Sequence, residues 1–436
     1  MSTYFTPDLP GALDAPGADT ARAFDALFRA TSAIGATHAG GLHRLAASAE
    51  DGRVRDLLRD WLAHHGFAVH VDRVGNLFGL AEFDPAAPWV LCGSHLDSQP
   101  SAGRFDGVYG VLAGAVAAAS IVGRFRAAGV RPACNLAVVD WTNEEGARFQ
   151  PSLTGSSAFT GAMTVDAALA CTDAQGVTLR QALAGIGYLG DTMLDLPLAA
   201  YVEMHVEQGA RLERDAVPIG VVGSTWAALK LRVRFDGEQS HTGPTPMAER
   251  RDALLAAAQV VTAVHAEASR HGERMHSSVG RLDIYPNSPN VVPSRTTLHV
   301  EFRSASTDLL DGAAQRFDAT LAEIAAHTGT RVEIESRQLR APLALDAGLA
   351  ALAHEVSASL GLRSADSVTV AGHDAISLSR VVPACLLFVP SRGGVSHNEA
   401  EFTEDADLHT GLRMLEALLE RLCLSAVPAR RAGPPW

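Results

Sequence analysis

The chain has 436 residues, of which 47% are hydrophobic and 19% are charged, and its formal net charge is −13. This length exceeds one typical hydrophobic core, so we expect a globular protein of two domains. Because the negative charge forms no acidic block and no apolar run reaches the roughly 18 residues that cross a bilayer, we expect neither a nucleic-acid partner nor a membrane span.

The first residues, MSTYFTPDLPG, have no basic stretch followed by an apolar one, so we expect no signal peptide. The five cysteines are scattered and form no CxxC pair; they are Cys92, Cys134, Cys171, Cys385 and Cys423. Such cysteines are typical of reduced residues in the core of a cytoplasmic protein.

The first half of the chain alternates between helical and strand patterns. Helices are predicted at 19–34, 48–65 and 107–129, and strands at 69–80 (a pair), 89–92, 135–141 and 197–205. This alternation indicates an α/β fold with an open, mostly parallel sheet, whose functional sites lie beyond the carboxyl ends of the strands.

From about residue 226 the pattern changes to strand, helix, strand, strand, helix, strand, which is typical of a ferredoxin-like α+β domain. Its strands are predicted at 229–235, 277–284, 296–302 and 331–335, and its helices at 245–271 and 307–327. The sheet pattern then resumes with a strand at 384–389. We therefore expect a catalytic domain formed by 1–225 and 339–436, interrupted by an inserted domain at 226–338.

The loop after the strand predicted at 89–92 contains His95, Asp97 and Asp106 within VLCGSHLDSQPSAGRFDG. On an extended segment His95 and Asp97 share one side, which suits a histidine that binds metal while a carboxylate fixes its ring. Taken alone, HxD is more often part of an ordinary polar loop than of a metal site.

Further metal-binding side chains follow the ends of later strands. Together the candidates are His95, Asp106, Glu145, His205 and His397, with Glu144 beside them. Histidine-bearing half-sites that share one carboxylate suit two borderline divalent ions, between which a water is activated near neutral pH. Asp106 is the natural shared carboxylate, and the adjacent glutamates would divide into a base and a ligand. Each histidine by itself is more often structural than catalytic.

Seven motifs occur in order along the chain, namely GSHLDS, GRFDGVYGV, WTNEEGARF, HVEQGARLE, HTGPTPM, AGHDA and SHNEAEFT. Together they resemble the successive motifs of the hydantoinase/carbamoylase amidases, which belong to the zinc aminoacylase/carboxypeptidase superfamily. The resemblance runs from about residue 41 to residue 422, across both expected domains. It implies a dinuclear metal amidohydrolase with an inserted lid and dimerisation domain.

The resemblance also implies roles for single residues. The two divalent ions, with zinc first and manganese, cobalt or nickel as alternatives, would be bound by His95, Asp106, Glu145, His205 and His397. Catalysis would use Glu144 as general base, Asp97 to orient His95, and His241 to reach the scissile carbonyl, often across a homodimer. Substrate contacts would come from Gln208, Asn290, Arg303, Gly372 and His373. For Arg303, the residues alone favour a surface ion pair.

Three functions are compatible with these residues. The first is hydrolysis of the ureido bond of an N-carbamoyl amino acid, or of allantoate, ureidoglycolate or N-carbamoyl-β-alanine. The second is a dipeptidase or aminoacylase of the same superfamily, although those branches usually have an acidic ligand where this chain has His205. The third is a ligand-binding protein without metals, against which the complete ligand set and Glu144 argue.

Overall fold

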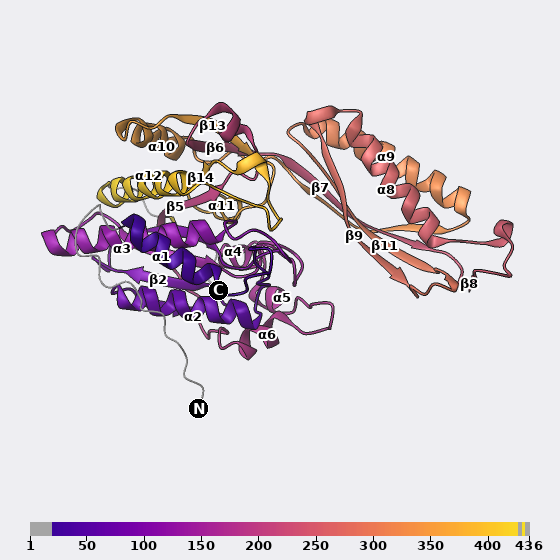
Figure 1. Cartoon of the computed structure of the whole chain (residues 1–436), viewed down its shortest axis with the longest axis horizontal. Coiled ribbons are helices and arrows are strands. Elements are labelled where there is room, and N and C mark those ends of the chain that lie inside the picture. Colours follow the sequence, from indigo (N-terminus) through magenta and orange to yellow (C-terminus); the bar gives the residue numbers. More distant parts are fainter. Residues whose placement is uncertain (1–19, 426–429, 432–436) are drawn as a thin grey trace. The chain divides into compact units, whose positions relative to one another are not determined.

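The computed structural model describes residues 20–425 and 430–431, so the predicted absence of a signal peptide concerns residues outside this part of the chain. The chain divides into two compact units (Figure 1). Unit 1 contains residues up to Gly223, Leu345–Ser367 and residues from Gly372 onward, and unit 2 contains Ser224–Ala344 and Val368–Ala371. The predicted boundaries were 226 and 338, and the short segment 368–371 was not expected in the inserted unit.

A large sheet forms the centre of unit 1, with the strand order β1-β2-β4-β3-β5-β14-β6-β13 and with β15 paired to β5. The strands are β1 (Ala68–Val71), β2 (Leu77–Ala81), β3 (Trp89–His95), β4 (Asn135–Trp141), β5 (Pro197–Val206), β6 (Ile219–Thr225), β13 (Ser364–Thr369), β14 (Ala384–Val389) and β15 (Arg430–Arg431). The four central strands, β4, β3, β5 and β14, are parallel, as predicted, and antiparallel pairs flank them.

The central strands are parallel because both of their faces are covered. Every residue of β3 and β4 is buried, so both strands are mostly apolar and do not alternate between apolar and polar residues. In the register of this pair, His95 lies opposite Trp141. The two strands therefore deliver their following loops to one edge of the sheet.

Helices surround this sheet, and α3 is the most buried of the long ones. The helices of unit 1 are α1 (Thr20–Ser32), α2 (Ala49–His64), α3 (Val108–Ala128), α4 (Thr154–Phe159), α5 (Val165–Leu169), α6 (Leu179–Gly185), α7 (Arg211–Asp215), α10 (Ala347–Ser359), α11 (Asp374–Leu378), α12 (Asp405–Leu424) and the 3₁₀ turn η3 (Arg392–Gly394). By length and composition α3 could cross a membrane, contrary to expectation, but 89% of its apolar window is buried inside the protein. It is the core helix of unit 1.

Small residues let α3 lie directly on the sheet. A Cβ atom at Gly110 would come within 2.2 Å of the Met204 carbonyl oxygen on β5, so no larger residue fits there. Beside this contact, the thiols of unit 1 are part of the packing. No disulfide joins any of the five cysteines, and Cys92, Cys134, Cys385 and Cys423 are buried.

Unit 2 is a four-stranded antiparallel sheet of order β12-β7-β11-β9, which is the predicted ferredoxin-like arrangement. Its elements are β7 (Ala227–Asp236), β8 (Ser240–His241), η1 (Met247–Glu249), α8 (Ala253–Ser269), η2 (Gly272–Arg274), β9 (His276–Tyr285), β10 (Val291–Val292), β11 (Arg295–Ser304), α9 (Thr307–Thr328) and β12 (Arg331–Arg340). One face of the sheet packs against α8 and α9 in a separate hydrophobic core.

Candidate metal centre

Three neighbouring parallel strands end at the same edge of the large sheet and carry candidate ligands there. His95 is the last residue of β3, and His205 is the last but one of β5. Glu144 and Glu145 follow three and four residues after the end of β4. This placement follows from the parallel pairing, since the carboxyl ends of parallel strands share one edge of the sheet.

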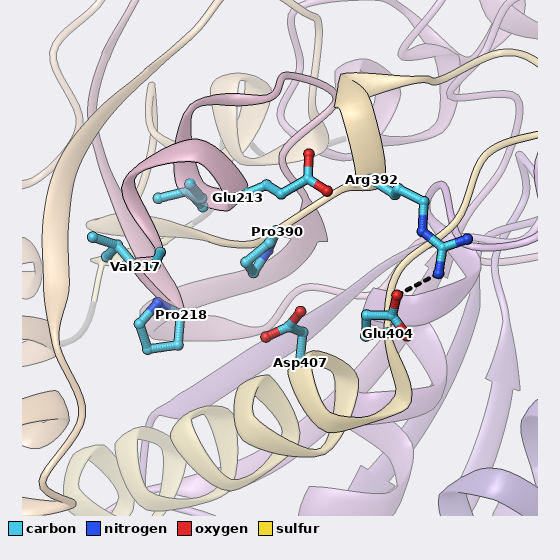
Figure 2. A pocket seen from close by; sticks show the side chains of 9 residues that line it. Glu213, Val217, Pro218, Pro390, Arg392, Glu404 and Asp407 are labelled. Atoms are coloured by element: carbon cyan, nitrogen blue, oxygen red, sulfur yellow. Dashed lines mark hydrogen bonds and ion pairs between the residues drawn. The ribbon is translucent and has the colours of Figure 1, made fainter.

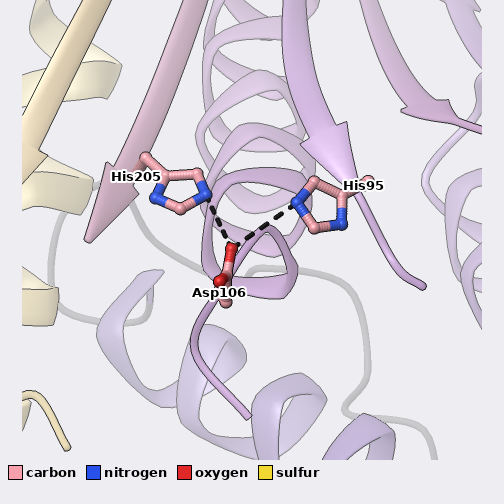
Figure 3. Close-up of side chains that lie close together, drawn as sticks. All are labelled: His95, Asp106 and His205. Atoms are coloured by element: carbon pink, nitrogen blue, oxygen red, sulfur yellow. Dashed lines mark ion pairs between the residues drawn. The ribbon is translucent and has the colours of Figure 1, made fainter. Parts of the chain in front are cut away.

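Asp106, in the loop before α3, lies at the centre of the candidate ligands (Figure 3). Its Oδ1 atom is 3.0 Å from Nε2 of His205 and 3.6 Å from Nε2 of His95. Its Oδ2 atom is 3.2 Å from Nε2 of His397, which is itself 3.4 Å from Oε2 of Glu145. One carboxylate thus faces a pair of imidazoles with one oxygen and a His–Glu pair with the other.

Hydrogen bonds to backbone carbonyls fix two of the imidazole rings. Nδ1 of His95 lies 2.9 Å from the Asp97 carbonyl oxygen, and Nδ1 of His205 lies 2.8 Å from that of Val206. A carbonyl only accepts, so the proton belongs on Nδ1 and Nε2 keeps its lone pair. The Gly107 N–H donates to Nε2 of His205 at 3.2 Å, in agreement with this tautomer.

Asp97 differs from expectation in how it acts on His95. Its carboxylate is 3.7 Å from Nδ1 of His95, whereas its own carbonyl makes the hydrogen bond. The carboxylate instead accepts the backbone N–H groups of Glu144 and Glu145, at 3.2 and 3.4 Å. Because the backbone carbonyl already takes the ring proton, the side chain is left to join the loop after β3 to the loop after β4.

The charges gathered here perturb one another strongly. Burial raises the pKa of Glu144 well above 4.5, against the opposing effect of His95, and burial together with Asp106 raises the pKa of Glu145 to about 7. Burial alone would lower the pKa of His95, but Glu144, Asp106 and Asp97 raise it well above 6.5. Such strongly perturbed groups in one place are typical of functional sites.

The donor set fits two divalent cations. Two groups of ligand atoms lie within 4.8 Å of one another, His95–Asp106–His205 and Asp106–Glu145–His397, and they share only Asp106. Imidazole nitrogen and carboxylate oxygen are the ligands of zinc and of other borderline divalent ions. Glu144 belongs to neither group, although its Oε2 is 3.5 Å from Nε2 of His95. It is therefore placed beside the ligands and not among them.

Two other predicted residues of unit 1 lie at the same centre. Gln208 donates from Nε2 to Oδ2 of Asp106 at 2.7 Å, and its buried Oε1 has no hydrogen-bond partner among the described residues. His373, which follows Gly372, is buried with its ring 4.6 Å from that of His205. A third potential ligand group joins His205 and His373 to Glu203. The carboxylate of Glu203, however, already accepts from the Ser94 hydroxyl and the Ala375 N–H, both at 2.7 Å.

Glu401, for which the sequence predicted no role, binds the backbone next to the candidate ligand Asp106. Its Oε1 accepts the N–H groups of Phe105 and Asp106 at 3.1 and 3.0 Å, and its Oε2 accepts the Ser396 hydroxyl at 3.1 Å. The available signal was its place in SHNEAEFT, four residues after His397. Only coordinates reveal that it holds the backbone of Asp106.

The remaining predicted residues belong to unit 2. His241, on β8, is exposed and pairs with Val291 of β10, and the Thr242 N–H donates to the Asn290 carbonyl at 3.3 Å. His241 and Asn290 are therefore neighbours.

Arg303, on β11, contacts Oε2 of Glu301 at 2.9 Å and the Val370 carbonyl at 2.6 Å. It lines a cavity of about 230 Å³ within unit 2, together with His276, Ser277, Ser278, Glu301 and Val370.

Another cavity, of about 260 Å³, lies on unit 1 between α7, the loop after β14 and the start of α12 (Figure 2). Arg392 and Glu404, which form an ion pair, both line it, and Glu213 and Asp407 add further carboxylates. None of the candidate ligands lines this cavity, so we do not assign it to the metal centre.

Comparison with known proteins identifies the family of this chain. The family model of peptidase family M20/M25/M40 matches residues 91–421. An N-carbamoyl-L-amino-acid amidohydrolase from Rhizobium meliloti is 36% identical, over 84% of this chain and 88% of that protein. An allantoate amidohydrolase from Bacillus subtilis is 31% identical, over 89% and 94%.

Among solved structures, a hydantoinase/carbamoylase family amidase from Burkholderia vietnamiensis superposes with a TM-score of 0.88 at 36% identity, over 93% of this chain and 98% of that one. The resemblance and the fold class predicted from the sequence are thus confirmed. The chain belongs to peptidase family M20/M25/M40, and its fold is that of the hydantoinase/carbamoylase amidases.

Proposed function

We propose that this protein is a dinuclear metal-dependent amidohydrolase that cleaves the ureido C–N bond of an N-carbamoyl amino acid, giving the amino acid, ammonia and carbon dioxide. The observation that carries the proposal is the position of Asp106. Its two oxygens face the Nε2 atoms of three histidines, and Glu144 lies beside them. Membership of the family makes the protein a hydrolase of carbon–nitrogen bonds.

The ligands of one cation would be His95, His205 and Asp106, and those of the other would be Asp106, Glu145 and His397. When bound, two such cations supply Lewis-acid polarisation of the ureido carbonyl and an activated water. Zinc suits the donor set first, and manganese, cobalt or nickel could replace it.

Glu144 is the proposed general base. It is buried, burial raises its pKa and so its affinity for a proton, and it is not needed as a ligand. It would take a proton from water and transfer it to the leaving nitrogen, a step that typically contributes 10²–10⁴-fold. Asp97 supports this role by holding the Glu144 backbone N–H.

Five further residues are proposed to recognise the substrate. Arg303 would bind the carboxylate of the ureido acid through a charge-assisted pair of hydrogen bonds. Gln208 supports a ureido group nearby, since its unpartnered Oε1 could accept an N–H donor. Gly372 and His373 would line the same pocket, and Asn290 would add a further contact to the carboxylate.

We further infer a homodimer formed through unit 2. His241 and Asn290 lie beyond the Arg295 end of β11, whereas Arg303 lies at its other end. Eight residues of extended strand separate these ends by roughly 26 Å, many times the length of a ureido group. Arg303 and His241 of one chain are therefore too far apart to hold the same small substrate. A second copy would supply His241 and Asn290, with His241 donating to the developing oxyanion.

A cytoplasmic location is part of the proposal. The support is that no disulfide joins any of the five cysteines, since the cysteines of secreted proteins usually form disulfides.

The experiment that tests the function is ammonia release from a panel of ureido acids. The panel contains N-carbamoyl-α-amino acids, N-carbamoyl-β-alanine, allantoate and ureidoglycolate, each assayed after chelation and again after Zn²⁺, Mn²⁺, Co²⁺ or Ni²⁺ is restored. We expect release that requires a divalent ion and is greatest with N-carbamoyl amino acids. The allantoate amidohydrolase relative makes allantoate the second candidate. Cleavage of dipeptides or N-acyl amino acids without ureido cleavage would contradict the proposal.

A further inference from the structure

The peptide groups on either side of Leu96, between His95 and Asp97, are held by buried charged side chains. The Leu96 N–H donates to Oδ1 of Asp140 at 2.9 Å, and its carbonyl accepts from Nε of Arg44 at 2.8 Å. Neither charged side chain is exposed to solvent. In the β3–β4 ladder, the last paired residue of β4 is Trp141, opposite His95. Leu96 is the next residue after this last pair, so its N–H lies beyond the end of the ladder and donates to the Asp140 carboxylate instead.

Arg55, on α2, lies behind Asp140 and is equally buried. Its Nη1 is 3.3 Å from Oδ2 of Asp140, an ion pair without the alignment of a hydrogen bond. Its Nη2 is 3.4 Å from the Thr142 hydroxyl, two residues before Glu144. The same guanidinium thus contacts the base of the loop after β3, through Asp140, and the base of the loop after β4.

We propose that Arg55 and Asp140 form a positioning pair that fixes the His95–Asp97 segment against the Glu144–Glu145 segment and so sets the geometry of the metal centre. Within the described part of the chain, neither residue forms a hydrogen bond or an ion pair with a candidate ligand side chain. The inference rests on the proposed function. The inference adds two residues that are not among the candidate metal ligands and that act through the backbone of the segments carrying those ligands.

The chain provides a matched control in Asp51. Its carboxylate is also fully buried, also pairs with Arg55 (Nε to Oδ1, 2.9 Å), and also accepts one backbone N–H (Ala47, 2.7 Å). The difference is which backbone it holds, because Ala47 precedes α2 and Leu96 lies between two residues of the centre. Asp140→Asn and Asp51→Asn therefore each remove a buried carboxylate charge that is paired with the same arginine.

The test measures the Co²⁺ affinity of wild-type protein and both variants by competition with a chelator, together with the visible d–d absorption of the bound Co²⁺. Outer-shell partners of metal sites typically change affinity 10–100-fold when they are mutated. We expect Asp140→Asn to weaken Co²⁺ binding at least about tenfold and to change the absorption spectrum. Asp51→Asn should lower thermal stability but bind Co²⁺ within about threefold of wild type with an unchanged spectrum.

Equal Co²⁺ affinities and spectra for the two variants would overturn the positioning role. If Asp140→Asn does not fold, the pair Asp140→Glu and Asp51→Glu replaces it, since the added methylene displaces the accepting oxygen while the charge remains. The same contrast between the two positions is then expected, and its absence overturns the inference. Wild-type protein that binds no Co²⁺ would overturn the proposed function itself, which distinguishes the two failures.

Discussion

In this protein, the hydrogen bonds that a side chain already makes decide which of its atoms can bind a cation. Nδ1 of His95 and Nδ1 of His205 are used by carbonyls, so only Nε2 can bind a cation. Asp106 is shared by both ligand groups, whereas Glu144 belongs to neither. Adjacent glutamates thus have different surroundings, which the sequence pair EE could suggest but not assign.

The first prediction concerns Glu144 alone. Glu144→Gln keeps the size of the side chain and removes the base, so turnover should fall about 10²–10⁴-fold. Metal content, measured by elemental analysis, should stay at the wild-type stoichiometry because Glu144 is not in either ligand group. Turnover within a few-fold of wild type would show that another group takes the proton.

At the scale of elements, the start of α3 is built around the imidazole of His95. Gly107 precedes the helix at a φ of +65°, and a Cβ there would lie 2.3 Å from ring atoms of His95. Gly129 follows the same helix at a φ of +64°, with nothing within 4 Å of an added Cβ. The two glycines therefore share a positive φ, but their ψ angles of −50° and 24° differ, and only Gly107 has a neighbour that an added Cβ would meet.

Alanine at either position adds backbone strain, since a positive φ is unfavourable for any Cβ. Gly129→Ala, in the left-handed region, should cost roughly 1 kcal/mol of stability, and Gly107→Ala should cost more because its ψ of −50° lies outside that region. Only Gly107→Ala should also displace His95 and weaken metal binding, by about tenfold or more, measured by chelator competition. Comparable metal affinities for Gly107→Ala and Gly129→Ala would mean that the His95 ring moves aside at little cost.

In unit 2, Glu267 fastens α8 to α9. Its nearly buried carboxylate accepts from Arg316 on α9 and from Arg270 and His271 beside it. Hydrogen bonds from Arg316, against a smaller opposing effect of burial, lower the pKa of Glu267 below 4.5. A carboxylate with a lowered folded-state pKa stabilises the fold above its unfolded-state pKa, and that stability is lost as the pH falls through the folded-state value.

Glu267→Gln should therefore lower the free energy of unfolding by about 2 kcal/mol at pH 7, where the charged carboxylate accepts strong hydrogen bonds. The difference from wild type should shrink as the pH falls below about 4.5. Denaturant unfolding at several pH values checks this, with Glu323→Gln on the exposed side of α9 as the control. A difference that is independent of pH would show that the charge of Glu267 is not what matters.

How far the sequence predicts these elements depends on how strong their patterns are. The apolar stretches within β3 and β4 and the ligands at their ends were recognisable. By contrast, β6 (IGVVGST) is rich in glycine and β13 (SADSVT) is polar, and neither was predicted. Contacts through backbone atoms, such as the Asp97 carbonyl with His95, leave no trace in residue types. The same holds for Arg55 and Asp140, which are far apart in the chain.

At the scale of the whole molecule, the proposed dimer makes each site depend on two chains. His241→Ala and Glu144→Gln should each be nearly inactive alone. In a dimer with one copy of each variant, one site combines an intact Glu144 with an intact His241 only if His241 acts across the interface.

Mixing the two variants after dissociation and reassociation should therefore restore a substantial part of the wild-type ammonia release. Size-exclusion chromatography with light scattering checks that dimers have re-formed, and wild type mixed with Glu144→Gln is the control. Mixed dimers that stay inactive would place His241 in the site of its own chain.

The positions of the five cysteine thiols make them probes of unfolding for one unit of the protein. All five thiols lie in unit 1 and none in unit 2, and burial raises the pKa of Cys92 and Cys385 to about 12. Thiolates, not thiols, react with alkylating agents, so these side chains should stay unlabelled until their surroundings open. The rate of alkylation, followed by mass spectrometry in rising urea, should therefore report the opening of unit 1 while ignoring that of unit 2. Unit 1 therefore carries its own chemical probes of unfolding, whereas unit 2 carries no thiol.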